Sequence, residues 1–347
     1  MSADIQLLHD LKKADLRYTT DTIKGMTRKK ENGTIVYFDT EGKKITSKSI
    51  LERIKNLVIP PAWNNVWICP SPTGYLQATG LDEKGRKQYI YHMDWKKQMQ
   101  ENKFNKMVDF AQVLPKIRQK IYKDMSNDEL DKEKIIATVV WLLEHTLIRI
   151  GNEEYAKEND SFGLTTLRNR HVKIRGEEVT FDFTGKSGVE HTVSITNPKI
   201  AKIIKQCFEL PGYEIFQYMN GDEKYTVDSS SVNDYLKQIT NEDITAKEFR
   251  TWGATVLGGE TLFSIGPADN EKTLKHNIAT AVKKVSQHLR NTASVCRTYY
   301  IHPTILQTYE KNILTPHFEK IYRDFDKSKT QLTRPEYATF TLLEKYS

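Results

Sequence analysis

The chain has 347 residues, of which 38% are hydrophobic and 28% are charged. This balance is typical of a globular protein with a sizeable core, it excludes a disordered tail, and the length allows two domains or one large one. No apolar run is long enough to cross a bilayer, and the N-terminal stretch reads as an amphipathic helix without the apolar core of a signal peptide. We therefore expect a cytosolic protein with no membrane contact.

The net charge indicates the kind of partner, and the cysteine spacing indicates the kind of cellular compartment. The formal net charge of +7 favours an anionic partner, with nucleic acid first, although many soluble proteins are this basic for no single reason. Cys69, Cys207 and Cys296 are far apart and form no CxxC pair. This spacing argues against a structural zinc site or a disulfide framework, and it fits a reducing compartment.

After the first helix, residues 1–97 predict a small β-rich domain. Residues 34–45, "TIVYFDTEGKKI", indicate a hairpin that turns at residues 40–42, and residues 46–60 indicate a short helix that stops at Pro60. Three β-prone runs follow, "VWIC", "YLQAT" and "KQYIYH", and turn sequences separate them. These runs predict an antiparallel meander that ends at His92, with a domain boundary near residue 97.

Residues 98–347 predict a larger, mainly helical domain. Residues 133–151 are apolar nearly all round, as in a central buried helix, with Gly151 as its C-terminal cap. Residues 167–195 indicate three short strands, with breaks at residues 175–176 and 185–188. Helical patterns resume at residues 197–210, 230–240, 245–262 and 270–291. The fold class is therefore α+β, a β-rich N-terminal domain followed by a helical domain that contains a three-stranded β-meander.

Two cations stand out at unusual positions. Arg149 lies near the end of the most apolar predicted helix, where a buried guanidinium is costly unless an anion meets it. The alternative is an arginine that snorkels or pairs with Glu153 or Glu154. Lys186 occupies a glycine-flanked turn that could approach another molecule closely, or it is an ordinary solvated turn lysine.

Two further stretches contain candidate groups. In "KEFRTWG", Lys247 and Arg250 lie three residues apart on one helix face, after a predicted capping box of Thr245 and Glu248. The alternative is a solvated basic face. In "NTASVCRTYYIHP", Asn291 precedes Tyr300 by nine residues, and its alternative role is a helix C-cap.

The candidate groups are therefore cations, an amide and a phenol. No carboxylate pair, histidine cluster, Walker loop or GxGxxG fingerprint accompanies them. Such a set suits a phosphodiester, because arginines can stabilise a pentacoordinate transition state, a lysine can protonate a leaving oxygen and a tyrosine can attack. We expect neither a metal nor another cofactor.

In this order the residues are recognisable, and the chain resembles the type IB DNA topoisomerases of the short poxviral and bacterial kind. The resemblance covers nearly the whole chain through the stretches "PPAW", "VWICPSPTGYLQATGLDEKGRKQYIYH", "LIRIGNEEYA", "GLTTLRNRHV", "FTGKSG", "KEFRTWGA" and "NTASVCRTYYIHP". The "LQATG…GRKQYIYH" stretch and the asparagine point to the bacterial branch. The resemblance implies a catalytic domain of the tyrosine recombinase/topoisomerase IB type.

The resemblance also implies a role for each candidate. Tyr300 matches the nucleophile, Arg149 and Arg250 match the arginines that hold the non-bridging phosphate oxygens, and Lys186 matches the general acid for the 5′ oxygen. Asn291 falls where poxviral and eukaryotic members have histidine, which implies an uncharged hydrogen-bond donor. Positions that match residues contacting DNA are Gln88, Tyr89, Tyr91 and Tyr155, with Lys247 as an accessory basic position.

One alternative concerns the histidine role. His288 lies three residues before Asn291, but its spacing to Tyr300 is too long for the family, so Asn291 is retained. Tyr299 occupies a position that the family fills with varied residues, and packing or surface contact is its expected role.

The implied reaction is relaxation of supercoiled duplex DNA. Tyr300 would form a 3′-phosphotyrosyl link, the cut end would rotate, and the 5′-hydroxyl would reseal the strand without ATP. The positive charges of Arg149 and Arg250 would favour the phenolate of the attacking tyrosine. We expect a monomer whose two domains clamp duplex DNA, in the cytoplasm with the bacterial nucleoid, or in a virus if the source is viral.

Two rival functions use the same fold or the same groups. Tyrosine recombinases share the Arg-Lys-Arg-Tyr chemistry, but they usually show His-x-x-Arg where this chain has Lys247-x-x-Arg250, and they carry an N-terminal helical bundle. A non-enzymatic DNA-binding protein could keep the fold, although every expected catalytic position is occupied here.

Overall fold

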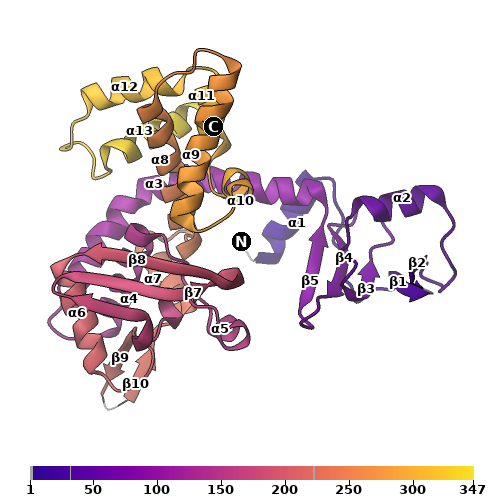
Figure 1. Ribbon diagram of the computed structural model, residues 1–347, viewed down its shortest axis with the longest axis horizontal. Helices are drawn as coiled ribbons and strands as arrows, with labels where there is room; N and C mark the ends of the chain where they lie inside the picture. The colour runs from indigo at the N-terminus through magenta and orange to yellow at the C-terminus, as the bar shows by residue number, and fades with distance from the viewer. Residues whose placement is uncertain (1–2, 32, 222) are drawn as a thin grey trace. The chain divides into compact units, whose positions relative to one another are not determined.

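The computed structural model describes residues 3–31, 33–221 and 223–347, which form two compact units (Figure 1). The first unit covers residues 1–104 and the second covers residues 105–347. The division falls within a long helix, α3 (Met93–Asp124), and the boundary predicted near residue 97 lies in the same helix.

The N-terminal unit is built on a five-stranded antiparallel sheet with the strand order β2-β1-β3-β4-β5. Its elements are α1 (Ala3–Lys13), β1 (Met26–Glu31), β2 (Thr34–Phe38), α2 (Lys48–Asn56), β3 (Asn64–Ile68), β4 (Leu76–Leu81) and β5 (Lys87–Tyr91). The amphipathic N-terminal helix, the short helix and the three-stranded antiparallel meander are confirmed. The first two residues of the predicted N-terminal helix lie outside the described residues.

The predicted hairpin at residues 34–45 needs correction. The turn is present, because the Asp39 N–H donates to the Lys43 carbonyl at 2.9 Å, but only Phe38 and Lys44 form a bridge beyond it. The regular partner of β2 is the preceding strand β1, with Arg28 opposite Tyr37. The sequence of β1, "MTRKKE", is too charged to predict a strand, and in the fold only Met26 of it is buried.

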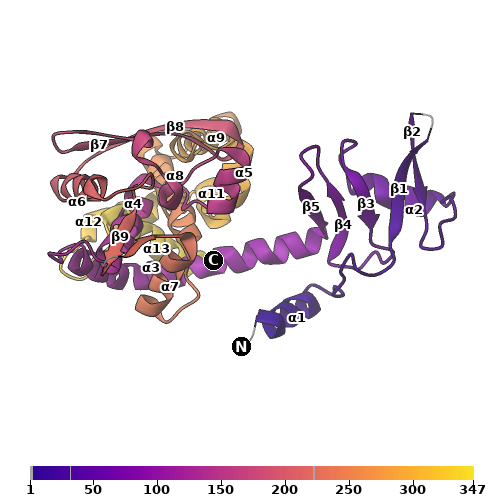
Figure 2. The same cartoon turned by 90° about the horizontal axis from the view of Figure 1, so that it is seen from below.

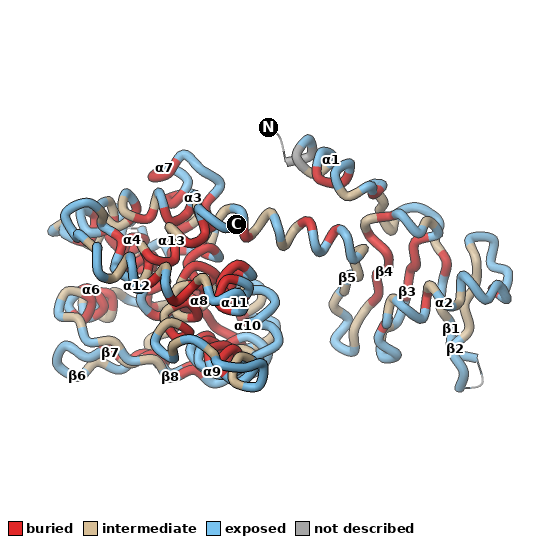
Figure 3. Tube along the Cα trace, turned by 90° about the horizontal axis from the view of Figure 1, so that it is seen from above, coloured by how far each residue is buried: buried red, intermediate tan, exposed pale blue. Residues whose placement is uncertain are grey.

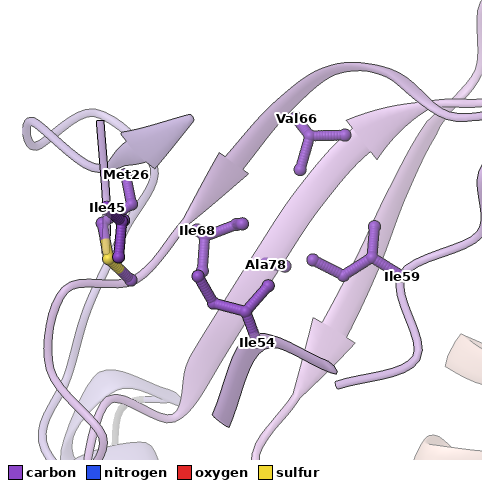
Figure 4. Packing of buried hydrophobic residues seen from close by; sticks show 7 residues of the cluster. All are labelled: Met26, Ile45, Ile54, Ile59, Val66, Ile68 and Ala78. Atoms are coloured by element: carbon purple, nitrogen blue, oxygen red, sulfur yellow. The ribbon is translucent and has the colours of Figure 1, made fainter. Parts of the chain in front are cut away.

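Buried aliphatic side chains hold the sheet of the N-terminal unit against α2. Figure 4 shows Ile54 of α2 directed toward Ile68 of β3 and Ala78 of β4, with Met26 and Val66 in the same cluster. A second cluster, around Leu11, Leu16 and Trp95, packs α1 against the start of α3. Strand β4 is buried at five consecutive residues, Leu76 to Gly80, because a further cluster of Trp67, Cys69 and Leu76 covers the face that alternation turns away from α2.

In the C-terminal unit, the central apolar helix is shorter than predicted. Helix α4 spans Lys132–Thr146, and Leu147, with a φ of 52°, is its left-handed cap. The predicted cap, Gly151, lies beyond it with a φ of 98°. The helix ends early because the Thr146 hydroxyl lies 3.2 Å from the Ile148 N–H and accepts its hydrogen bond, and because Leu164 and Thr165 donate to the carbonyls of residues 149 and 150. Arg149 therefore lies in the irregular segment that follows the helix.

The three predicted strands of this unit form an antiparallel sheet with the order β6-β7-β8, and α6 packs on β7 (Figure 2). The bounds are β6 (Val172–Arg175), β7 (Glu178–Gly185), β8 (Val189–Thr196) and α6 (Pro198–Glu209). The breaks predicted at residues 175–176 and 185–188 are confirmed as the two turns. Helix α7 (Ser229–Thr240) also agrees with its prediction.

Helix α8 (Ala246–Ile265) is the centre of the C-terminal unit. It contacts α4, α7 and α9 (Glu271–Leu289), and also α11 (Pro303–Glu310), α12 (Leu314–Asp324) and α13 (Arg334–Tyr346). Most of its residues are buried, as Figure 3 shows. In the C-terminal unit, the elements absent from the sequence prediction are these last three helices, α5 (Glu153–Asn159), α10 (Ala293–Tyr299) and the hairpin of β9 (Gln217–Asn220) and β10 (Glu223–Thr226).

None of the helices in the described residues has the length and apolarity that a membrane crossing requires.

Ile54→Ala tests whether the cluster in Figure 4 stabilises the N-terminal unit. Ile54 is 1% exposed, so its truncation should lower the unfolding free energy of this unit by about 2–5 kcal/mol. Hydrogen exchange at the amides of β3 and β4, measured by mass spectrometry on the full chain, reports that free energy. Ile50→Ala, on the same helix but 37% exposed, is the control and should change it by less than about 1 kcal/mol. Equal effects of the two substitutions would contradict the packing.

Candidate active site

Arg250 is a buried cation of the C-terminal unit. It lies in the second turn of α8, whose start has the predicted capping box of Thr245 and Glu248. Its side chain is 5% exposed, and its guanidinium donates hydrogen bonds to the carbonyls of Leu147 and, at 3.1 Å, of Leu289. Both carbonyls lie at helix ends, where no helical N–H can use them. The fold thus supplies neutral acceptors to a buried charge.

The surroundings of Arg250 lower its pKa but leave the side chain positively charged near pH 7. Burial, and next the positive charge of Arg149, lower the pKa of Arg250 to about 10, while Tyr300 opposes the shift as a hydrogen-bond partner. Arg250 therefore remains a cation near pH 7.

Lys247 does not share this environment, because it is exposed at the first turn of α8. Lys247 and Arg250 lie three residues apart on α8, as predicted, but Lys247 is exposed and Arg250 is buried.

Arg149 and Asn291 lie 142 positions apart in the chain, and the fold brings them together. Arg149 Nη2 donates to Asn291 Oδ1 at 2.9 Å. The carboxylate pairing considered from the sequence does not occur among the described residues, since Glu153 pairs with Lys157 at 2.6 Å. Arg149 is half-buried and carries its charge into the same site as Arg250.

Asn291 is not a helix cap. The residue that ends α9 in the left-handed conformation is Arg290, with a φ of 52°, and the Asn291 N–H then donates to the Ser286 carbonyl at 3.0 Å. This backbone hydrogen bond fixes the direction in which the amide leaves the helix. His288, the alternative considered from the sequence, is one turn back on α9, and it is Asn291 that contacts Arg149.

Tyr300 lies at the end of the short helix α10, beside Arg250. The guanidinium carbon of Arg250 is 5.4 Å from the centroid of the Tyr300 ring. Tyr299 is 49% exposed, whereas Tyr300 is partly buried, so the structure separates two residues that are adjacent in the chain. Of the two, Tyr300 is the tyrosine beside the arginine cluster, which consists of Arg149 and Arg250.

Thr255 fixes the backbone on both sides of the Tyr300–Ile301 pair. Its hydroxyl oxygen lies 3.1 Å from the Tyr300 carbonyl and accepts the His302 N–H at 3.1 Å. It also lies 2.8 Å from the Thr251 carbonyl of its own helix. Thr255 is fully buried and lies on α8, the helix of Arg250, so one rigid element positions both the arginine and the tyrosine. No pattern in the sequence marks this residue.

Lys186 lies at the exposed tip of the β7–β8 hairpin, followed by Ser187 with a φ of 66° and Gly188 with a φ of 72°. The tip is thus a tight left-handed turn that presents the lysine to solvent. The hairpin is linked to the end of α9 where Arg290 Nη2 approaches the Thr192 carbonyl at 3.5 Å. This contact ties the hairpin to the segment that carries Asn291.

The residues predicted to contact DNA fall into different places. On β5, Tyr89 and Tyr91 stack with centroids 6.1 Å apart, and Lys87 lies over the Tyr89 ring. Gln88 points to the opposite face, as strand alternation requires, and donates to Asp82 at 3.0 Å. Gln88 therefore cannot share one face of the sheet with Tyr89 and Tyr91. Tyr155 is half-buried on α5 of the other unit.

The arginine cluster and Asn291 include buried donors that have no partner. Arg250 Nε and Asn291 Nδ2 are both buried and make no hydrogen bond within the described residues. Neither Arg149 nor Arg250 has a carboxylate partner among them, and no group of histidine, cysteine or acidic side chains there could hold a metal ion. Unpaired donors on a buried arginine and on an amide, beside a second arginine, are the chemistry that binds a phosphate.

Comparison with known proteins agrees with this chemistry. A family model described as "Eukaryotic DNA topoisomerase I, catalytic core" matches residues 92–325, more than half of the chain. A second, "Bacterial DNA topoisomerase IB, N-terminal domain", matches residues 35–82. The chain belongs to the type IB DNA topoisomerase family.

Viral relatives of this family align over most of the chain. A protein named DNA topoisomerase 1B from Acanthamoeba polyphaga mimivirus is 32% identical over 298 residues, which are 84% of this chain and 89% of the relative. DNA topoisomerase 1B of vaccinia virus (strain Copenhagen) is 27% identical over 240 residues, covering 68% and 73% of the two chains. The type IB match at residues 35–82 lies in the N-terminal unit, and the catalytic-core match begins just before α3.

Thr255→Val should lower the cleavage rate by about 10- to 100-fold, because two backbone groups beside Tyr300 lose their buried partner and the tyrosine is no longer held in place. Thr255→Ser keeps the hydroxyl and is the matched control, which should stay within about threefold of the native rate. Single-turnover cleavage of duplex DNA measures both. If the valine variant cleaved as fast as the serine variant, the hydroxyl would not position Tyr300.

Proposed function

We propose that this chain relaxes supercoiled duplex DNA as a type IB topoisomerase, by transient cleavage of one strand through a 3′-phosphotyrosyl intermediate. The observation that carries the proposal is the contact of Tyr300 with Arg250, beside the Arg149–Asn291 pair and with unpaired donors left over for a phosphate. The family match supports the same activity.

The proposed chemistry exchanges one phosphodiester for another. The Tyr300 phenol gives its proton to solvent and its oxygen attacks the phosphorus. The bond from phosphorus to the 5′ oxygen breaks, and the Lys186 ammonium gives its proton to that oxygen as it leaves. The free 5′ end then rotates around the intact strand. Attack of the 5′-hydroxyl on the phosphotyrosine restores the strand and the phenol, so the bond energy is conserved and ATP is not needed.

The proposed transition state has extra negative charge on the non-bridging oxygens. Arg149, Arg250 and Asn291 offer donors that are already held by the fold, and such donors need little reorganisation during the reaction. The buried Nε of Arg250 and the buried amide nitrogen of Asn291 are the atoms we assign to the phosphate.

DNA binding is proposed for both units, as a clamp requires. In the N-terminal unit, Tyr89 and Tyr91 offer an aromatic surface beside Lys87, and Gln88 lies on the other face of the same edge strand. Tyr155 and Lys247 are the proposed contacts of the C-terminal unit. We further propose a catalytic domain of the tyrosine recombinase type, action as a monomer, and a place with the DNA of a bacterial or viral source.

The rival functions are separable by experiment. A recombinase requires paired specific sites, whereas this protein should relax a plasmid that has none, at a rate proportional to enzyme concentration. The exposed Lys247, where recombinases usually carry histidine, favours the topoisomerase. A binding-only protein would never form a covalent adduct, so mass spectrometry of the trapped complex, with the adduct mapped to Tyr300, tests the proposal most directly.

Tyr300→Phe should abolish cleavage and plasmid relaxation, because the attacking oxygen is gone. Tyr299→Phe is the matched control and should keep most of the activity, since its side chain is 49% exposed. A plasmid relaxation assay and a gel for the covalent adduct measure both variants. Relaxation by the Tyr300 variant would refute the assignment of the nucleophile.

DNA affinity should fall steeply with salt, because contacts with phosphates release counterions. For several such contacts, the association constant should drop by about 100-fold or more between about 50 mM and about 200 mM salt. The measurement uses Tyr300→Phe, so that binding is not complicated by cleavage. Lys247→Gln should make the dependence shallower, by about one unit of the logarithmic slope. An affinity that hardly changes with salt would rule out a clamp that binds the backbone.

A further inference from the structure

His191 is a buried histidine that the proposed chemistry does not use. It lies on β8, opposite Phe183 on β7, is 4% exposed, and its ring stacks on the Phe183 ring with centroids 4.9 Å apart and an angle of 8° between the planes. Its Nε2 atom is buried and has no hydrogen-bond partner within the described residues. A buried polar atom without a partner costs free energy, so its presence calls for a reason.

The ring lies directly against the residue that precedes Lys186. A Cβ atom added to Gly185 would come within 2.7 Å of both Cδ2 and Nε2 of His191, which shows that the imidazole occupies the space beside this glycine. Gly185 pairs with Val189 and is the last residue of β7 before the tip. The His191 ring therefore packs against the backbone at Gly185, where the hairpin tip begins.

The charge state of His191 suits this position. Burial, and next the cations Arg149, Arg250 and Arg290, lower the pKa of His191 to about 4, so the ring is neutral near pH 7. A neutral ring adds no repulsion to a tip that carries a lysine.

The tip itself is held by few contacts of its own. Lys186, Ser187, Gly188 and Val189 are all exposed, and the residues at 187 and 188 have positive φ angles. The direction of the Lys186 side chain thus depends on the path that the chain takes at Gly185. Because the lysine side chain is long, a small change of backbone direction at Gly185 would displace the ammonium group farther than it displaces the backbone itself.

We propose that His191 is the positioning residue for Lys186: its ring, stacked on Phe183 and packed against Gly185, sets the path of the hairpin tip so that the lysine reaches the leaving 5′ oxygen. This inference rests on the proposed role of Lys186 as general acid. It assigns to His191 no contact with DNA.

The test compares two leaving groups. A duplex whose cleavage position has been mapped with the native protein is made with either oxygen or sulfur at the bridging 5′ position. Thiols ionise near pKa 8.5, far more readily than alcohols, so a sulfur leaving group departs as thiolate without a general acid. A defect that acts through Lys186 should therefore nearly vanish on the sulfur substrate.

On the oxygen substrate, His191→Ala should slow single-turnover cleavage by about 10- to 100-fold at saturating DNA, with DNA affinity close to native. Because loss of a buried ring also lowers stability, the rate is measured well below the unfolding temperature of the variant. On the sulfur substrate, its rate should be within about threefold of the native rate. His191→Phe keeps a flat ring on Phe183 and should recover most of the loss on oxygen. Ser194→Ala, on the exposed face of the same strand, is the control and should cleave both substrates normally.

A second variant approaches the same contact from the other side. Gly185→Ala should show the same defect on oxygen and the same recovery on sulfur, because its Cβ displaces the ring. Combined with His191→Ala, the two losses should be clearly less than additive, since removal of the ring makes room for the methyl group.

Two results distinguish failure of the inference from failure of the proposed function. Lys186→Ala is measured in parallel on both substrates. The positioning role is wrong if the sulfur substrate restores cleavage by Lys186→Ala while His191→Ala is slowed by the same factor on both substrates. It is also wrong if His191→Phe cleaves the oxygen substrate as slowly as His191→Ala does. If sulfur does not rescue Lys186→Ala, the assignment of Lys186 as general acid is itself wrong.

Discussion

The buried guanidinium of Arg250 is the constraint on which the site depends. A charge in the core is tolerated only if its donors find acceptors, and here the acceptors are the carbonyls of Leu147 and Leu289. Both carbonyls are available because α4 and α9 end at these points. Two helices must therefore stop beside α8, and the chain that leaves each of them carries Arg149 in one case and Asn291 in the other.

The fold holds this site in place although some of its buried hydrogen-bond donors have no acceptor among the described residues. Arg149 and Arg250 repel each other, and neither has a carboxylate partner among the described residues, while the Arg250 Nε and the Asn291 amide nitrogen lack acceptors. The fold holds these groups in place through helix ends and through Thr255, at some cost in stability. An anion bound among these donors would relieve that repulsion, as the proposed phosphate site requires.

Much of the fold could be predicted from local patterns, and the failures have physical causes. The capping box of α8 and the strands at residues 172–196 depend on neighbouring residues, so the sequence predicts them. The end of α4 was misplaced, because the hydrogen bonds that stop it come from residues 164 and 165. Strand β1 was missed, since its charged sequence is stabilised by pairing with β2 and β3 rather than by its own pattern.

By itself, the sequence determined the set of reactive groups and their order, and these are enough to indicate a phosphodiester as substrate and a family resemblance that the comparisons bear out. Only the tertiary structure decided their relations. It separated Tyr300 from Tyr299, turned Lys247 outward and Arg250 inward, and brought Asn291 to Arg149. It also revealed Thr255 and His191, whose effect comes from contacts with residues distant in the chain. The reason is general: side-chain chemistry is written in the residue type, but burial and hydrogen-bond partners exist only after segments far apart in the chain have packed together.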